Sequence, residues 1–127
     1  MNQKKILLID DDSIHNIITK KFIELFSPTS LVKEFMEVSK SLEYLEQEAK
    51  GNFPDYIFVD LRMPVHDGFY FLDQIEILYQ KKLKNSNVYV VSSSSLESDI
   101  KKSLAYGFVN GFIEKTKLKN SLKKILS

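Results

Sequence analysis

The sequence predicts an α/β domain in which a parallel sheet is covered by helices on both faces. Short apolar runs alternate five times with segments of helical periodicity, which is typical of repeated βαβ units. Several of these runs are continuously apolar, as expected for strands that are buried on both faces. The five predicted strands span residues 6–9, 31–35, 56–59, 88–91 and 109–113.

The first two strands are each followed by a predicted amphipathic helix. After the run ILLI, apolar residues recur at helical spacing with charged residues between them, at Ile14, Ile17, Ile18, Phe22, Leu25 and Phe26. After the run LVKEF, one helical stripe contains Val38, Leu42, Leu45 and Ala49. Gly51 and Asn52 end the second helix.

The other three strands each end close to a polar side chain. YIFV ends on Asp60 and is followed by the turn-forming segment RMPVHDG and a helix with Phe69, Leu72, Ile75, Ile77 and Leu78. VYVV ends on Ser92, and a helix around Ile100, Leu104 and Ala105 stops at Gly107. VNGFI ends near Lys115, and the last helix contains Leu118, Leu122, Ile125 and Leu126.

Length and composition indicate one globular domain over residues 1–127, with no output domain visible. Apolar residues make up 43% of the chain, and nine Phe and six Tyr provide material for a core. The net charge of +1 gives no sign of a nucleic-acid or membrane surface. We expect a cytoplasmic protein, because there is no cysteine, signal peptide or membrane-length apolar stretch.

The polar residues that follow the strands are predicted to meet in one crevice. In an open parallel sheet, the ligand site lies beyond the carboxyl ends of the strands. The first strand ends on three carboxylates, Asp10, Asp11 and Asp12, and the third ends on Asp60. Carboxylates this close repel one another unless a cation compensates, and Mg²⁺ prefers oxygen ligands of this kind.

With such an ion bound, a carboxylate can act as a nucleophile on phosphorus. Asp60 is the best candidate, because it stands alone after a central apolar run. The Ser92 hydroxyl and the Lys115 ammonium would then hold two phosphoryl oxygens.

In their order and spacing, these segments resemble the receiver domains of two-component response regulators (CheY-like). The matching segments are LLIDDD, VDLRMPVHDG, VVSSS and GFIEK, and the resemblance covers essentially the whole chain. It implies a flavodoxin-like (βα)5 fold with strand order 2-1-3-4-5. It also implies a signalling protein that catalyses its own phosphorylation and dephosphorylation, rather than a turnover enzyme in the usual sense.

The resemblance assigns roles to individual residues. Asp60 would be the phosphoacceptor, with Asp11 binding Mg²⁺ (or Mn²⁺) directly and Asp10 mainly through water. The main-chain carbonyl of Arg62 would be a further metal ligand. Ser92 and Lys115 would sense the phosphoryl group.

The resemblance also implies partners and a switch. The phosphoryl group would come from a sensor histidine kinase or a histidine phosphotransfer protein. Phe112 would be the switch aromatic, and a downstream protein would read the surface formed by residues 96–126. Arg62 and Ser94 would influence the phosphate lifetime. We expect a monomer or weak dimer, with neither nucleic acid nor membrane as a partner.

One position departs from the family. The family lysine is commonly followed by a proline in a cis peptide, but here Thr116 follows Lys115, and a cis bond before threonine costs about 3–4 kcal/mol. Either the loop after the last strand takes a trans path, or it is strained. Thr116 could instead cap the last helix through its side-chain oxygen. Asp12 or Ser13 is expected to cap the first helix, while His15 and His66 are expected to be solvated or to lie on a helix surface.

Two alternative functions remain open. The run ILLIDDD also fits the opening signature of haloacid dehalogenase-type phosphatases, with Asp10 as nucleophile and Asp12 as acid/base. In that family, however, the later acidic motif follows the hydroxyl and lysine motifs, whereas Asp60 precedes Ser92 here. The other alternative is a pseudo-receiver that binds partners without being phosphorylated.

Overall fold

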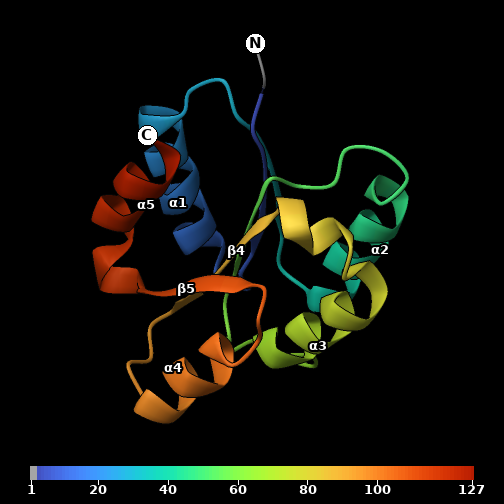
Figure 1. Ribbon diagram of the computed structural model, residues 1–127. Coiled ribbons are helices and arrows are strands. Elements are labelled where there is room, and N and C mark those ends of the chain that lie inside the picture. The colour runs from blue at the N-terminus through green and yellow to red at the C-terminus, as the bar shows by residue number, and fades with distance from the viewer. Residues whose placement is uncertain (1–2) are drawn as a thin grey trace.

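A computed structural model describes residues 3–127 of the chain (Figure 1). The strands are β1 (Lys5–Ile9), β2 (Leu31–Phe35), β3 (Tyr56–Val59), β4 (Asn87–Ser92) and β5 (Val109–Glu114). The helices are α1 (Ser13–Phe26), α2 (Val38–Glu48), α3 (Gly68–Tyr79), α4 (Glu97–Leu104) and α5 (Leu118–Leu126). Two 3₁₀ helices, η1 (Lys82–Asn85) and η2 (Lys115–Lys117), precede β4 and α5.

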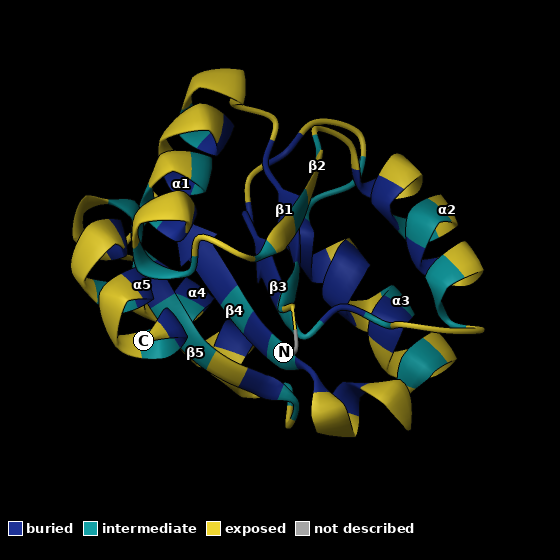
Figure 2. Cartoon of the chain, turned by 90° about the horizontal axis from the view of Figure 1, so that it is seen from above, coloured by how far each residue is buried: buried dark blue, intermediate teal, exposed yellow. Residues whose placement is uncertain are grey.

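The five strands form one parallel sheet in the order β2-β1-β3-β4-β5, which confirms the predicted fold and strand order. Seen from above, α1 and α5 lie on one side of the sheet and α2 and α3 on the other (Figure 2). Within residues 3–127, no helix is both long and apolar enough to cross a membrane.

Strand β1 shows why the central apolar runs are continuous. Because successive side chains of a strand point to opposite faces, Leu7 and Ile9 pack into the core under α2 and α3. Ile6 and Leu8 pack into the second core, under α1 and α5. All four residues are at most 2% exposed, so both cores depend on the same strand.

Helix α1 packs differently from the sequence pattern. Four of the six apolar residues in its predicted stripe are exposed: Ile14, Ile17, Ile18 and Leu25. Its buried residues are Asn16, Thr19 and Ile23. The predicted amphipathic helix exists, but most of its apolar stripe faces outward, because polar side chains that find hydrogen-bond partners occupy the inner face.

One of these polar side chains attaches α1 to the end of β1, and another bonds within the helix. The side-chain amide of Asn16 donates to the main-chain oxygen of Asp10 at 2.9 Å, and the Thr19 hydroxyl donates to the His15 carbonyl at 2.8 Å. Asp12 is the N-cap, as predicted, and its carboxylate accepts the main-chain N–H groups of Ile14 and His15.

The segment after β5 takes a trans path. No peptide bond within residues 3–127 is cis, so Thr116 is joined to Lys115 by a trans bond. The suggestion that Thr116 caps the last helix is wrong: Thr116 lies inside η2, and Lys117 occupies the N-cap of α5 without a side-chain cap.

Gly68 fixes the start of α3 against the end of β3. Its N–H donates to the Leu61 carbonyl at 3.0 Å. A Cβ at residue 68 would lie 2.3 Å from the main-chain oxygen of Asp60, which leaves no room for a methyl group. In the intervening turn, Val65 has a φ of 69°, an unusual conformation for a β-branched residue.

We expect Gly68→Ala to lower the free energy of unfolding by about 1–3 kcal/mol, because main-chain atoms beside Asp60 must move to admit the methyl group. Urea denaturation measures the change. Gly51→Ala is the matched control, since a Cβ there meets nothing within 4 Å, and it should change stability by less than about 0.5 kcal/mol. Equal stability of the two variants would contradict the tight contact.

Candidate functional site

Main-chain hydrogen bonds place Asp10 and Asp60 side by side at the carboxyl ends of β1 and β3. The Asp10 N–H donates to the Phe35 carbonyl at 3.0 Å, and the Asp60 N–H donates to the Ile9 carbonyl at 2.9 Å. These bonds continue the strand ladders by one residue. The first side chains beyond the two buried strands therefore meet at one edge of the sheet.

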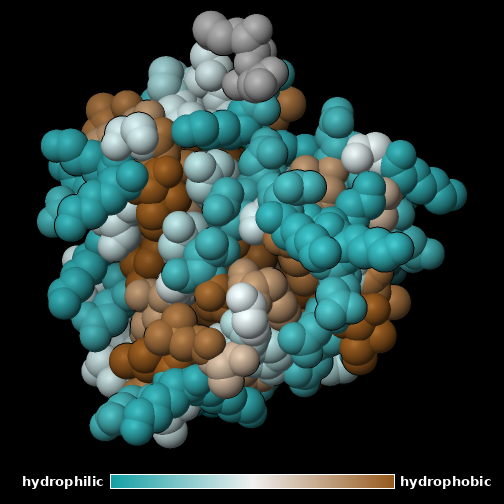
Figure 3. Space-filling model, in the orientation of Figure 1, coloured by the Kyte–Doolittle hydropathy of each residue, from teal (hydrophilic) through white to brown (hydrophobic). Residues whose placement is uncertain are grey.

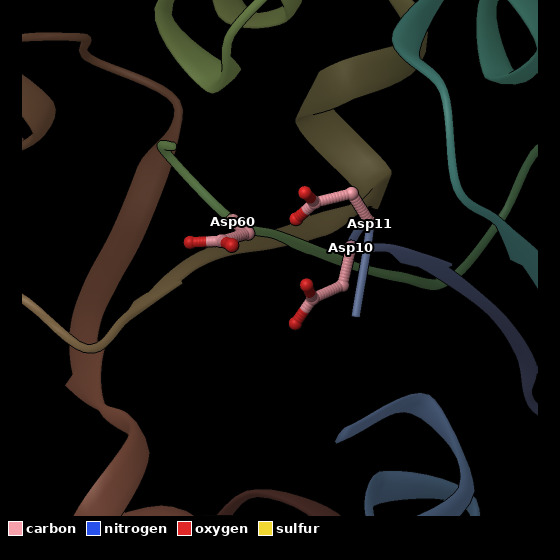
Figure 4. A group of neighbouring side chains, drawn as sticks. All are labelled: Asp10, Asp11 and Asp60. Atoms are coloured by element: carbon pink, nitrogen blue, oxygen red, sulfur yellow. The ribbon is translucent and has the colours of Figure 1, made fainter. Parts of the chain in front are cut away.

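Asp10, Asp11 and Asp60 form a compact acidic group (Figure 4). One carboxylate oxygen from each residue lies within 4.8 Å of the others. Asp10 and Asp60 are 5% and 6% exposed, whereas Asp11 is open to solvent. The structure thus brings the three acids together as the sequence predicted, with two of them withdrawn from water.

Lys115 lies between the two buried acids. Its Nζ is 2.9 Å from Oδ2 of Asp10 and 3.4 Å from Oδ2 of Asp60. Burial alone would lower the pKa of Lys115, but hydrogen bonding to Asp10 and the charges of both acids outweigh burial and raise it. The trans bond to Thr116 therefore still allows Lys115 to reach the site.

The two buried acids have opposite pKa shifts. Burial raises the pKa of Asp60 to about 6, and the neighbouring charge of Asp10 acts in the same direction. Burial would also raise the pKa of Asp10, but hydrogen bonds from His15, the Asp12 N–H and Lys115 outweigh it and lower this pKa to about 2. The negative charge of Asp10 is therefore stabilised by its surroundings, whereas the negative charge of Asp60 is poorly compensated.

The sequence analysis missed His15. It was expected to be solvated or to lie on a helix surface, but its Nδ1 lies 3.0 Å from Oδ2 of Asp10 and its side chain is only 15% exposed. The signal was its place in the first turn of α1, from which a side chain can reach back to the end of β1. His66 lies outside this group and stacks on Tyr70.

Ser92 is buried at the end of β4, on the same edge of the sheet. Its hydroxyl oxygen accepts the N–H of Ser94 at 3.1 Å, and within residues 3–127 no hydrogen bond joins it to Asp60. Arg62 lies two residues beyond Asp60, and its guanidinium contacts Asp99 of α4. Phe112 on β5 is half-buried and packs against the core under α2 and α3.

The donor set suits a hard divalent cation. Its side chains offer carboxylate oxygens, and Mg²⁺ prefers oxygen ligands while taking few carboxylates from the protein. A cation there would offset the repulsion between Asp10 and Asp60. Asp12 has a structural role, because its carboxylate caps α1. This differs from the acid/base role that Asp12 would have in a dehalogenase-type phosphatase.

Comparison with known proteins finds related sequences for most of the chain. The family model described as "Response regulator receiver domain" matches residues 6–127. The probable methanogenesis regulatory protein FilR2 of Methanothrix harundinacea is 26% identical over 94% of this chain and 76% of its own length. Two other curated relatives are longer, and the chain spans less than half of each.

Solved structures share the fold. The phosphorylated cyanobacterial phytochrome response regulator RcpA is 27% identical, with a TM-score of 0.83 over 98% of this chain and 91% of that one. The Mn²⁺-bound form of response regulator Rcp1 is 19% identical, with a TM-score of 0.83 over 98% and 95%. The chain therefore belongs to the response regulator receiver domain family of two-component phosphorelay signalling.

Proposed function

We propose that this receiver domain accepts a phosphoryl group on Asp60 in a Mg²⁺-dependent reaction. The observation that carries the proposal is the contact of Lys115 with both Asp10 and Asp60, at the sheet edge where the three acids meet. A phosphohistidine of a sensor kinase or phosphotransfer protein would be the donor. The similar protein RcpA has been solved in a phosphorylated form.

The proposed transfer is a displacement at phosphorus. A carboxylate oxygen of Asp60 forms a bond to phosphorus while the bond to the donor histidine nitrogen breaks, and that nitrogen leaves with the bonding electron pair. Lys115, already 3.4 Å from Asp60, would hold one of the transferred oxygens. The Ser92 hydroxyl would hold another after turning from its bond with Ser94.

The metal ligands would be the carboxylates of Asp11 and Asp60 with the main-chain carbonyl of Arg62, and Asp10 would bind the metal mainly through water. When bound, Mg²⁺ supplies positive charge that offsets the negative charge on the transferring oxygens. Asp60 is mostly ionised at neutral pH, because its pKa is raised only to about 6. It is therefore more basic than an ordinary aspartate and still available as a nucleophile.

Output would pass through α4, β5 and α5. Rotation of Ser92 toward the phosphoryl group would free space into which half-buried Phe112 could turn. Hydrophobic residues gather over α4 beside β5 on the face shown in Figure 3, and Leu96 and Leu104 are 59% and 48% exposed. A downstream protein could read a change at this surface.

The phosphodonor would dock along the outer face of α1. This helix begins directly after the acidic group, and its exposed isoleucines, Ile14, Ile17 and Ile18, continue away from it. Exposed apolar stripes of this kind mark protein contacts. Their position would bring the donor histidine to Asp60.

We expect the protein to gain the mass of one phosphoryl group when incubated with acetyl phosphate and Mg²⁺, because this small donor bypasses the kinase. Intact-mass spectrometry measures the gain, and peptide mapping should locate it on Asp60. Asp60→Asn should abolish the gain, while Asp73→Asn on α3 is the matched control and should retain it. A label on Asp10 would favour phosphatase chemistry, and no gain with Mg²⁺ present would favour a pseudo-receiver.

Asp60→Asn should also stabilise the metal-free protein by about 1–3 kcal/mol at pH 7.5. Because the pKa of Asp60 is raised to about 6, the folded protein binds a proton on the Asp60 carboxyl more tightly than the unfolded chain does. The stability gained from this protonation is complete below the unfolded pKa of 3.8 and is lost as the pH rises through about 6. Urea denaturation in EDTA at several pH values tests this. The advantage of the variant should disappear near pH 4, and its absence at pH 7.5 would contradict the unfavourable charge.

Ile17→Glu should slow phosphotransfer from any kinase that phosphorylates the wild type by about tenfold or more, because a charge on a buried contact costs binding energy. Ile77→Glu on α3 is the matched control: residue 77 is 74% exposed, lies on another helix, and should transfer normally. Gel assays with radiolabelled kinase measure the rates. Equal rates for the two variants would exclude α1 as the docking face.

A further inference from the structure

A buried carboxylate joins helix α4 to two loops of the site. Asp99, in the first turn of α4, is only 7% exposed. Its Oδ2 lies 2.5 Å from Nη2 of Arg62, in the loop after β3, and 3.3 Å from Oγ of Ser94, in the loop after β4. Asp99 therefore links the loop after Asp60 to the loop after Ser92.

Ser94 extends this link to the buried hydroxyl of Ser92. The Ser94 N–H donates to Ser92 Oγ at 3.1 Å, and the Ser94 hydroxyl oxygen accepts the Leu96 N–H at 3.2 Å. The hydroxyl of Ser94 thus donates to Asp99, while its main chain positions Ser92. One continuous set of contacts runs from Arg62 through Asp99 and Ser94 to Ser92.

Asp99 contributes to more than the start of its own helix. An acid in the first turn often caps the helix or complements its dipole, and both recorded side-chain partners of this carboxylate come from other segments. A carboxylate with so little exposure must be compensated by hydrogen bonds or charge. The Arg62 guanidinium and the Ser94 hydroxyl provide that compensation.

We propose that Asp99 is a positioning residue that holds the 92–94 segment in the arrangement seen here, with the Ser92 hydroxyl bound to the Ser94 N–H. Its consequence for phosphorylation rests on the proposed function, in which Ser92 turns from this bond toward a phosphoryl group on Asp60. The Arg62–Asp99–Ser94 contacts favour the unphosphorylated arrangement. Weakening them makes the phosphorylated arrangement easier to reach.

The chain offers a matched control for a general loosening of α4. The Tyr106 hydroxyl, just after α4, donates to Asp73 of α3 at 2.5 Å. Asp73→Asn weakens a carboxylate contact near the same helix without touching Ser92 or Ser94. Asp99→Asn weakens the proposed contact with the same change of side chain.

The first experiment uses the protein without phosphate or metal and does not depend on the proposed function. Amide exchange measured by NMR should be at least about threefold faster at Ser94 in Asp99→Asn than in the wild type, because local opening becomes easier. Asp73→Asn should leave the Ser94 rate unchanged. Unchanged Ser94 exchange in Asp99→Asn, or equal acceleration in both variants, would overturn the proposal.

The second experiment measures the switch with beryllofluoride and Mg²⁺, titrated by NMR. Asp99→Asn should bind about threefold to tenfold more tightly than the wild type, while Asp73→Asn should match the wild type. Arg62→Met should show part of the gain, and combining it with Asp99→Asn should add little, because both act on one contact. Additive gains or unchanged affinity in Asp99→Asn would overturn the proposal.

The role of Asp99 and the phosphorylation of Asp60 can fail independently, and the experiments distinguish the two failures. If the wild type binds no beryllofluoride, phosphorylation of Asp60 fails, while the exchange rates at Ser94 still decide the role of Asp99. If Asp99→Asn does not fold, Arg62→Met tests the same contact from its exposed end, since that side chain is 57% exposed. Urea denaturation of each variant establishes that it is folded.

Discussion

The site depends on two carboxylates that the sheet holds together although they repel. Strands β1 and β3 are neighbours, so Asp10 and Asp60 leave the sheet side by side with little access to water. Lys115 contacts both acids, but hydrogen bonds to Asp10 satisfy that residue first. The negative charge of Asp60, the residue proposed to react, is therefore poorly compensated, because the fold places more hydrogen-bond donors around Asp10 than around Asp60.

Much of this arrangement could be predicted from short segments of sequence. Continuous apolar runs identify strands that are buried on both faces, and the residue after each run must lie at the same edge of a parallel sheet. The same rule predicts that Asp10, Asp11 and Asp60 lie close together. Lys115 follows from the same rule, although the peptide after it differs from the family pattern.

Contacts that depend on the orientation of a helix could not be predicted in this way. Helical periodicity shows which residues of α1 share a face, but not which face turns inward, and the stripe containing Ile14 and Ile17 turned out to be largely exposed. The place of His15 beside Asp10 follows from that orientation. Asp99 was missed for a related reason, because its partners, Arg62 and Ser94, come from separate loops.

The two helices beside the site, α3 and α4, differ in how easily they can move relative to Asp60. On one side, the first residue of α3 touches the main chain of Asp60 so closely that Gly68 cannot carry even a methyl group. On the other side, α4 follows a short loop after Ser92 and meets the site through side-chain hydrogen bonds. Added bulk at Asp60, the carboxylate proposed to react, would therefore be accommodated by movement of α4 and its loop rather than of α3.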